Sequence, residues 1–161
     1  MGGFPILSAV VFLPLIGALI IMGVRSATAG SFSSEEAGKD SRAALLAGLI
    51  ISSATFVASV AAFLTFDPNA AGYQLVEQYA WYGEITYKVG IDGLSMPLIL
   101  LTTFLTPICL LASWNSINTR VTEYVVAFLV LETFMLGVFA ALDIVLFYIF
   151  FEAGLIPMFL I

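Results

Sequence analysis

Long apolar stretches alternate with shorter polar connections along the whole chain. Five stretches are apolar for about twenty residues each, at 4–24, 43–66, 93–114, 123–142 and 143–161. A hydrocarbon core of about 30 Å requires roughly 20 helical residues at about 1.5 Å each. Barrel strands would instead alternate over short segments. The pattern predicts an all-α, polytopic integral membrane protein, with five transmembrane helices forming a single membrane domain over 1–161. Because the first stretch lacks a basic start and a small-residue cleavage site, we interpret it as a span and not as a signal peptide.

The distribution of basic residues predicts the orientation of these helices. Four of the five lie in the connections at 25–42 and 115–122, namely Arg25, Lys39, Arg42 and Arg120. The connection at 67–92 holds only Lys88. The positive-inside rule then places the first and third connections in the cytoplasm or matrix, and the N-terminus on the opposite side.

The connection at 67–92 differs from the others in its pattern of apolar and aromatic residues. Ile85, Tyr87, Val89 and Ile91 alternate strictly after a turn at 83–84, which indicates a strand in a short hairpin. Its tyrosines and Trp81 are also typical of an aromatic belt at the membrane surface. The segment is either an interfacial loop or a packed element that contacts a neighbouring subunit. The connection at 25–42 is polar and rich in Gly and Ser, and we expect a mobile loop without chemistry there.

Composition supports a membrane protein and narrows the chemistry. The chain is 61% hydrophobic and 10% charged, whereas soluble domains carry about 25% charged residues. A net charge of −6 without a basic patch excludes nucleic acid as an expected partner. With no histidine and the single Cys109, haem, iron–sulfur and zinc sites are not expected. No nucleotide-binding loop or nucleophile triad is present, so we expect no cofactor and no metal on this chain.

Two glutamates fall inside the predicted spans. Glu152 lies nine residues beyond Asp143, which is placed to cap the last helix. Glu132 lies nine residues beyond Glu123, which stands at the start of the fourth span beside a possible Thr122 cap. Nine residues rise about 13.5 Å, so both glutamates are expected near the midplane of adjacent antiparallel helices. Whether they face each other is left open by the sequence, and Glu123 and Asp143 are interpreted as caps and interface residues.

A carboxylate at the bilayer centre costs about 2.5–3.5 kcal/mol on insertion scales. Tyr148 adds a hydroxyl on the face of Glu152, one turn earlier. Pro157 would free the carbonyl of Ala153 beside that carboxylate. Glu152, and with less support Glu132, are therefore candidates for a proton relay that exchanges a proton when a neighbouring charge changes. The alternative is that each is a protonated acid that holds helices together.

Two stretches carry a family resemblance. VGIDGLSMPLILLTTFLTPICLLASW at 89–114 and GVFAALDIVLFYIFFEAGLIPMFLI at 137–161 resemble the antiporter-like chain M of NADH:quinone oxidoreductase, the mitochondrial subunit-4 type in respiratory complex I. The arrangement Phe-Tyr-x-Phe-x-Glu-x-x-x-x-Pro in the second is close to the fifth transmembrane helix of that family. The similarity covers the whole chain and is weakest at 25–42.

The resemblance implies a non-redox subunit of a proton-translocating NADH:ubiquinone reductase. Electron transfer, with NADH, FMN, iron–sulfur clusters and quinone, is then expected on other subunits. In the family, the glutamate matching Glu152 pairs with a lysine on a later helix, and the carboxylate matching Glu132 contributes to a hydrophilic axis. Family members have about fourteen helices, so the chain is expected to be part of a larger antiporter-like bundle and not to pump protons alone. Partners are expected to be other membrane subunits, above all adjacent antiporter-like ones, within a bacterial inner membrane or the mitochondrial inner membrane.

Two rival functions remain. Multisubunit sodium/proton antiporters and membrane-bound hydrogenases carry similar subunits, and residues 91–95 occur across several of these relatives. A purely structural membrane anchor is the other rival. Its helices would need no carboxyl at the midplane, so Glu132 and Glu152 count against it.

Overall fold

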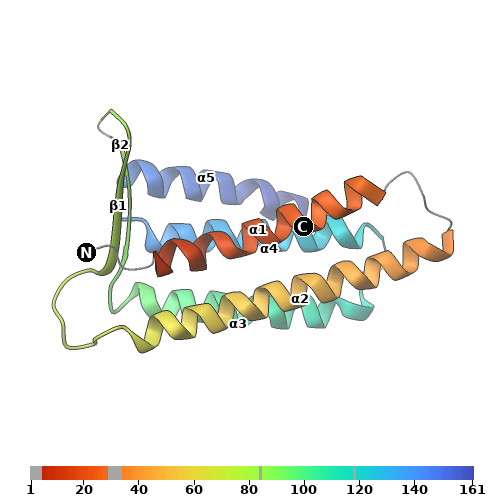
Figure 1. The fold of residues 1–161 in the computed structure, drawn as a ribbon, viewed down its shortest axis with the longest axis horizontal. Helices are drawn as coiled ribbons and strands as arrows, with labels where there is room; N and C mark the ends of the chain where they lie inside the picture. Colours follow the sequence, from red (N-terminus) through yellow and green to blue (C-terminus); the bar gives the residue numbers. More distant parts are fainter. Residues whose placement is uncertain (1–4, 29–33, 84, 118) are drawn as a thin grey trace.

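The computed structural model describes residues 5–28, 34–83, 85–117 and 119–161. Its elements are, in chain order, α1 (Ile6–Thr28), α2 (Ser34–Leu64), β1 (Gln74–Tyr82), β2 (Ile85–Ile91), α3 (Ser95–Ala112), the short 3-10 helix η1 (Ser113–Asn115), α4 (Val121–Ala140) and α5 (Ile144–Leu160). The helices run side by side along the long axis, and the hairpin of β1 and β2 stands across one end of them (Figure 1).

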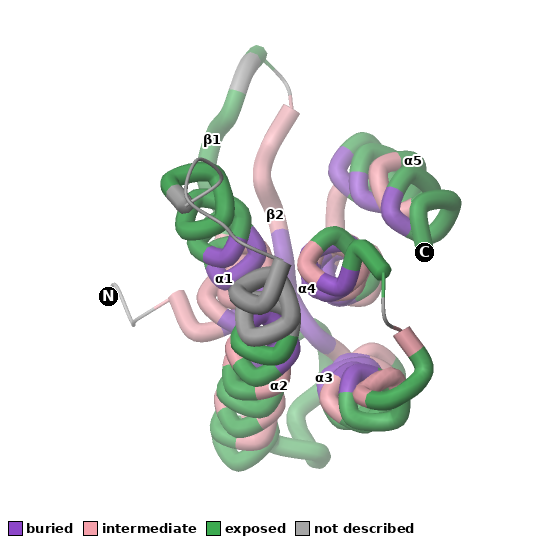
Figure 2. The backbone as a smooth tube through the Cα atoms, turned by 90° about the vertical axis from the view of Figure 1, so that its right-hand side faces the viewer, coloured by how far each residue is buried: buried purple, intermediate pink, exposed green. Residues whose placement is uncertain are grey.

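Helix α4 lies at the centre of the helical layer. It packs against α1, α2, α3 and α5, whereas α5 has α4 as its main helical neighbour. Figure 2 shows α4 between α1, α3 and α5 in an end-on view. The central place of α4 explains why half of its residues are buried, while on α5 only Leu146, Phe150 and Pro157 are buried in the described chain.

The apolar pattern predicted the helices well, except for the start of α2 and the number of helices long enough to span a membrane. Helix α2 begins at Ser34, so the polar stretch 34–42, which the sequence assigned to a loop, is helical where it is described. Glu, Ala, Lys and Arg in that stretch are good helix formers, and polarity alone does not break a helix. Residues 29–33 of the predicted loop lie outside the described residues.

The described helices that are long and apolar enough to cross a membrane are four, over Ile6–Ala27, Arg42–Leu64, Ser95–Asn115 and Val121–Ala140. Helix α5 is apolar but has 17 residues, which corresponds to about 25 Å. The predicted total of five spans is therefore not reached by these four helices alone.

The predicted hairpin is confirmed. β1 and β2 pair antiparallel, with Tyr79 opposite Tyr87 and with irregularities near both ends of β1. Val89 and Ile91 are fully buried, and Val89 also bridges to Ala141, between α4 and α5. The Leu142 amide donates to the carbonyl of Lys88 at 2.9 Å. The hairpin is thus packed on the helix ends and is more than a surface loop.

Glu77 of β1 caps the N-terminus of α1, which is distant from it in sequence. Its carboxylate accepts from the amide of Leu7 at 2.8 Å and from the amide of Ser8 at 3.1 Å. The Ser8 hydroxyl also donates to Glu77 and lies 2.9 Å from the Tyr87 hydroxyl. Burial is the largest cause that raises the pKa of Tyr87, opposed by its hydrogen bond with Ser8. The first turn of α1 is therefore bound to the hairpin.

Glycines lie at tight contacts between helices. A Cβ added at Gly48 of α2 would lie 2.4 Å from Cγ1 of Val125 on α4. A Cβ added at Gly137 of α4 would lie 2.5 Å from Cδ1 of Phe150 on α5. Small residues at such positions let membrane helices approach closely, and here they seat α4 between its neighbours.

Candidate functional site

Among the residues that the structure describes, Glu132 is the acidic residue that is buried. It lies on α4, near the middle of that helix, and is 1% exposed. Neither carboxyl oxygen is in hydrogen-bond geometry with any described residue. A buried polar group without a partner costs about 1–3 kcal/mol, and an isolated charge costs more. Such a group is expected where its protonation serves a function.

The Glu132 side chain lines a cavity of about 290 Å³ at the seam of α3 and α4. The polar side chains that share this lining are Thr102, Thr106 and Cys109, all on α3. The Thr106 side chain shares this lining with Glu132 from the opposite helix, and its hydroxyl donates to the carbonyl of Thr102 at 3.0 Å. The rest of the lining is apolar, so these few groups determine which polar ligand the cavity can hold.

Further hydroxyls are buried elsewhere between the helices. They are Ser52, Thr55 and Ser59 on α2, Thr103 on α3 and Thr133 on α4. All five donate to a carbonyl of their own helix, and the hydroxyl oxygens of Ser59 and Thr103 lie 2.8 Å apart, which joins α2 to α3. Our sequence reasoning missed these residues. The signal was available, since residues 52, 55 and 59 recur at the spacing of one helix face.

Glu152 lies elsewhere and is exposed on α5. Tyr148, one turn earlier on the same helix, is 60% exposed. The lining of the Glu132 cavity comes from α3 and α4, so the structure does not join the two glutamates in one cavity. Pro157 is buried, and α5 continues through it to Leu160.

Asp143 caps α5 as predicted. Its carboxylate accepts from the amides of Val145 at 2.8 Å and Leu146 at 3.2 Å. The predicted Thr122 cap on α4 is wrong, because the helix begins at Val121, after Arg120 in a left-handed conformation with φ 53°.

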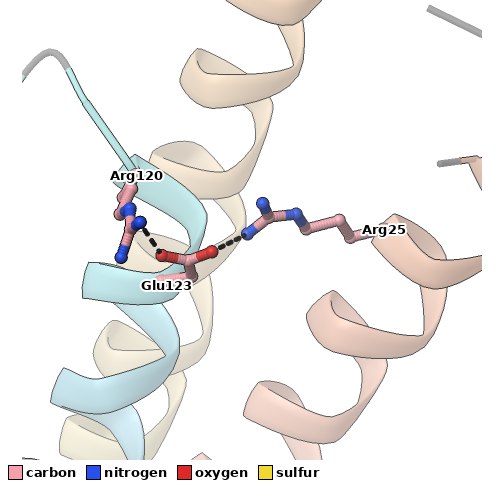
Figure 3. A network of polar contacts seen from close by, with 3 residues as sticks. All are labelled: Arg25, Arg120 and Glu123. Atoms are coloured by element: carbon pink, nitrogen blue, oxygen red, sulfur yellow. Dashed lines mark ion pairs between the residues drawn. The ribbon is translucent and has the colours of Figure 1, made fainter. Parts of the chain in front are cut away.

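Glu123 consequently lies within the first turn of α4 and forms ion pairs. Its carboxylate lies 3.2 Å from Arg25 of α1 and 3.7 Å from Arg120 (Figure 3). These side chains are about half or more exposed, so each pair contributes at most about 1 kcal/mol. The pairs place the connection after α1 and the connection before α4 at the same end of the bundle, as the distribution of basic residues implied.

Among the residues that the structure describes, no three His, Cys, Asp or Glu side chains gather in a way that could hold a metal ion. A carboxyl group such as Glu132 can take up and release a proton, and the hydroxyls of Thr102 and Thr106 lie in the lining of the same cavity.

Comparison with known proteins identifies relatives along almost the entire chain. A family model described as NADH-ubiquinone oxidoreductase chain 4, amino terminus, matches residues 43–141. NADH-quinone oxidoreductase subunit M of Rhodobacter capsulatus is 45% identical over 156 residues, which cover 97% of this chain and 29% of that protein. NADH-ubiquinone oxidoreductase chain 4 of Marchantia polymorpha is 40% identical over 159 residues, covering 96% of this chain and 29% of that protein.

The chain thus spans less than a third of the length of these relatives. The matched region includes Glu132, and the similarity to the relatives agrees with the resemblance found in the two sequence stretches. Because the family model matches well over half of the residues, the chain belongs to the family of NADH-ubiquinone oxidoreductase chain 4.

Proposed function

We propose that this chain is a proton-translocating membrane subunit of NADH:quinone oxidoreductase, in which Glu132 and Glu152 carry protons. The observation that supports this most directly is the Glu132 carboxyl, sequestered on the central helix without a hydrogen-bond partner among the described residues. A scaffold that only anchors other subunits would gain nothing from that cost.

Family membership supports the host complex. The relatives are named as subunits of NADH-quinone or NADH-ubiquinone oxidoreductase. With several helices long enough to cross a bilayer, the chain is a multi-pass protein of an inner membrane. We place NADH, flavin, iron–sulfur clusters and quinone on other subunits, because this chain has no histidine and one cysteine. Its part in turnover is then to move protons while electrons pass elsewhere.

We further propose that α5 is a fifth span in a larger helical bundle. Its 17 residues reach the lower limit of about 17 for a spanning helix. Most of its apolar side chains are exposed, with Ile144 at 86% and Phe159 at 91%. Glu152 on this surface is accessible to a group from another helix, in keeping with the lysine partner that the resemblance implies. Other membrane subunits of the complex are the proposed neighbours.

Substitution of the two glutamates in the assembled complex tests the proposal. Glu152→Gln keeps size and hydrogen-bonding capacity but cannot titrate. We expect it to lower proton uptake into reconstituted vesicles and coupled NADH:quinone turnover at least tenfold, with assembly on a native gel unchanged. Glu152→Asp should lose less, because it retains a titratable carboxyl. Glu132→Gln should lower pumping too, whereas Glu123→Gln, at an exposed ion pair, is the matched control. Native pumping by assembled Glu152→Gln and Glu132→Gln complexes would rule the relay out.

A further inference from the structure

The cavity beside Glu132 needs an occupant that can satisfy two carboxyl oxygens. Its volume of about 290 Å³ is several times the roughly 30 Å³ that one water takes up in the liquid. A buried water also needs two to four polar partners. The two oxygens of Glu132 and the hydroxyls of Thr102 and Thr106 supply that number. Water therefore fits this place both by size and by chemistry.

The Thr106 hydroxyl can act on Glu132 in two different ways. It has one proton, which it donates to the carbonyl of Thr102 at 3.0 Å. In that orientation its oxygen can only accept, and only a protonated carboxyl can donate to it. An ionised carboxyl has no proton to give and requires a donor. For an ionised Glu132, the hydroxyl can supply a donor, in addition to the cavity water, by turning away from Thr102 toward the carboxylate.

Few other groups compete for this role. The other titratable side chain in the lining is Cys109, on α3. The elements packed on α4 besides α3, which are α1, α2, α5 and β2, contribute no described residue to the lining. Thr133, next to Glu132 in sequence, is committed to the carbonyl of Leu129 at 3.1 Å and does not line the cavity.

We propose that the α3–α4 cavity is a hydrated proton site, in which the Thr106 hydroxyl turns between the Thr102 carbonyl and the Glu132 carboxylate as Glu132 gains and loses its proton. On release, the O–H bond of Glu132 breaks and its electron pair stays on the carboxylate. The proton passes to a cavity water, which becomes hydronium. Thr106 keeps its own proton and is a positioning residue. This inference rests on the proposed function of Glu132 as a proton carrier.

Infrared difference spectroscopy of the assembled complex tests the role of Thr106. The carbonyl stretch of protonated Glu132 is identified as the band that Glu132→Gln removes. Thr106→Val keeps the shape but removes the acceptor, so the band should shift to higher wavenumber. Proton translocation should fall by about twofold to tenfold, the size expected for one hydrogen bond. Thr106→Ser should restore both. Thr133→Val is the matched control and should move neither. Exchange into water labelled with oxygen-18 should shift a water band that changes together with the Glu132 band.

The outcomes separate this inference from the proposed function. If Thr106→Val leaves the Glu132 band in place while Glu132→Gln abolishes pumping, the hydroxyl switch is wrong and the relay stands. If the band shifts in Thr106→Val but Glu132→Gln pumps at the native rate, the relay role is wrong while the contact is real. The absence of any water band that responds to Glu132 would overturn the hydration of the site.

Discussion

Removal of the Glu77 carboxylate should loosen the first turn of α1. This carboxylate accepts from the amides of Leu7 and Ser8 and from the Ser8 hydroxyl, although it belongs to a strand some seventy residues away in sequence. In Glu77→Ala, these two helix-terminal amides lose their acceptor. The hairpin would also lose its polar attachment to α1.

The magnitude follows from two contributions. Loss of a side-chain acceptor at a helix N-terminus costs about 0.5–2 kcal/mol. Loss of a negative charge there costs about 0.3–1 kcal/mol more. Glu77→Ala should therefore lower the local free energy of opening by about 1–3 kcal/mol. Glu77→Gln retains one carbonyl oxygen and should lower it by the charge contribution alone, about 0.3–1 kcal/mol.

Amide hydrogen exchange in lipid nanodiscs measures these differences. In Glu77→Ala, the amides of Leu7 and Ser8 should exchange about fivefold to more than a hundredfold faster, since about 1.4 kcal/mol corresponds to a factor of ten. Amides at the far end of α1 should not change. Glu123→Ala, which breaks exposed ion pairs at that far end, serves as a control for loss of an acidic side chain. Equal exchange of Leu7 and Ser8 in native and Glu77→Ala proteins would refute the reasoning.

Two further predictions concern packing and pH. Gly137→Ala should lower the thermal unfolding midpoint of the purified protein, because overpacking against Phe150 costs about 1–3 kcal/mol. An unchanged midpoint would contradict this. Gly23→Ala, with open space around the new methyl group, is the control. The pKa of Asp92 lies below its ordinary value of 3.8, chiefly because the backbone amide and then the hydroxyl of Ser95 donate to it. The stability that Asp92 adds to the start of α3 is therefore complete above pH 3.8 and is lost as pH falls through the lowered pKa. Protection of the Ser95 amide from hydrogen exchange, corrected for intrinsic exchange, should drop only in that acidic range. Loss of protection between about pH 5 and 7 would contradict this.

Local patterns in the sequence predicted local structure. Apolar runs indicated the helices, strict alternation indicated β2, and the position of Asp143 indicated its cap, because each depends on residues a few positions apart. The helical start of α2 was missed because a polar composition reports exposure to water and does not report backbone conformation.

The candidate site was predicted less completely. The depth of Glu132 followed from its distance to the helix end, but the face it presents did not. Helix α4 is apolar around most of its circumference, so its hydrophobic periodicity does not tell which face packs against α3 and which against α5. The cavity shared by Glu132 and Thr106 and the cap from Glu77 join residues far apart in sequence, and only the packing of the helices and hairpin brings them together.

Strand β2 of the hairpin is also a common reference point for the positions of Glu132 and Glu152 along their helices. Strand β2 continues into α3 through three residues, and it is joined to Ala141 and Leu142 where α4 gives way to α5. Glu132 lies nine residues before Ala141, and Glu152 lies nine residues after Asp143, so each is about 13.5 Å from the same strand. A residue inserted into α5 between Asp143 and Glu152 would leave Glu132 at its height and in its cavity. It would carry Glu152 about 1.5 Å along the bundle axis and about 100° around it. The strand thus provides one reference level for the two glutamates on separate helices.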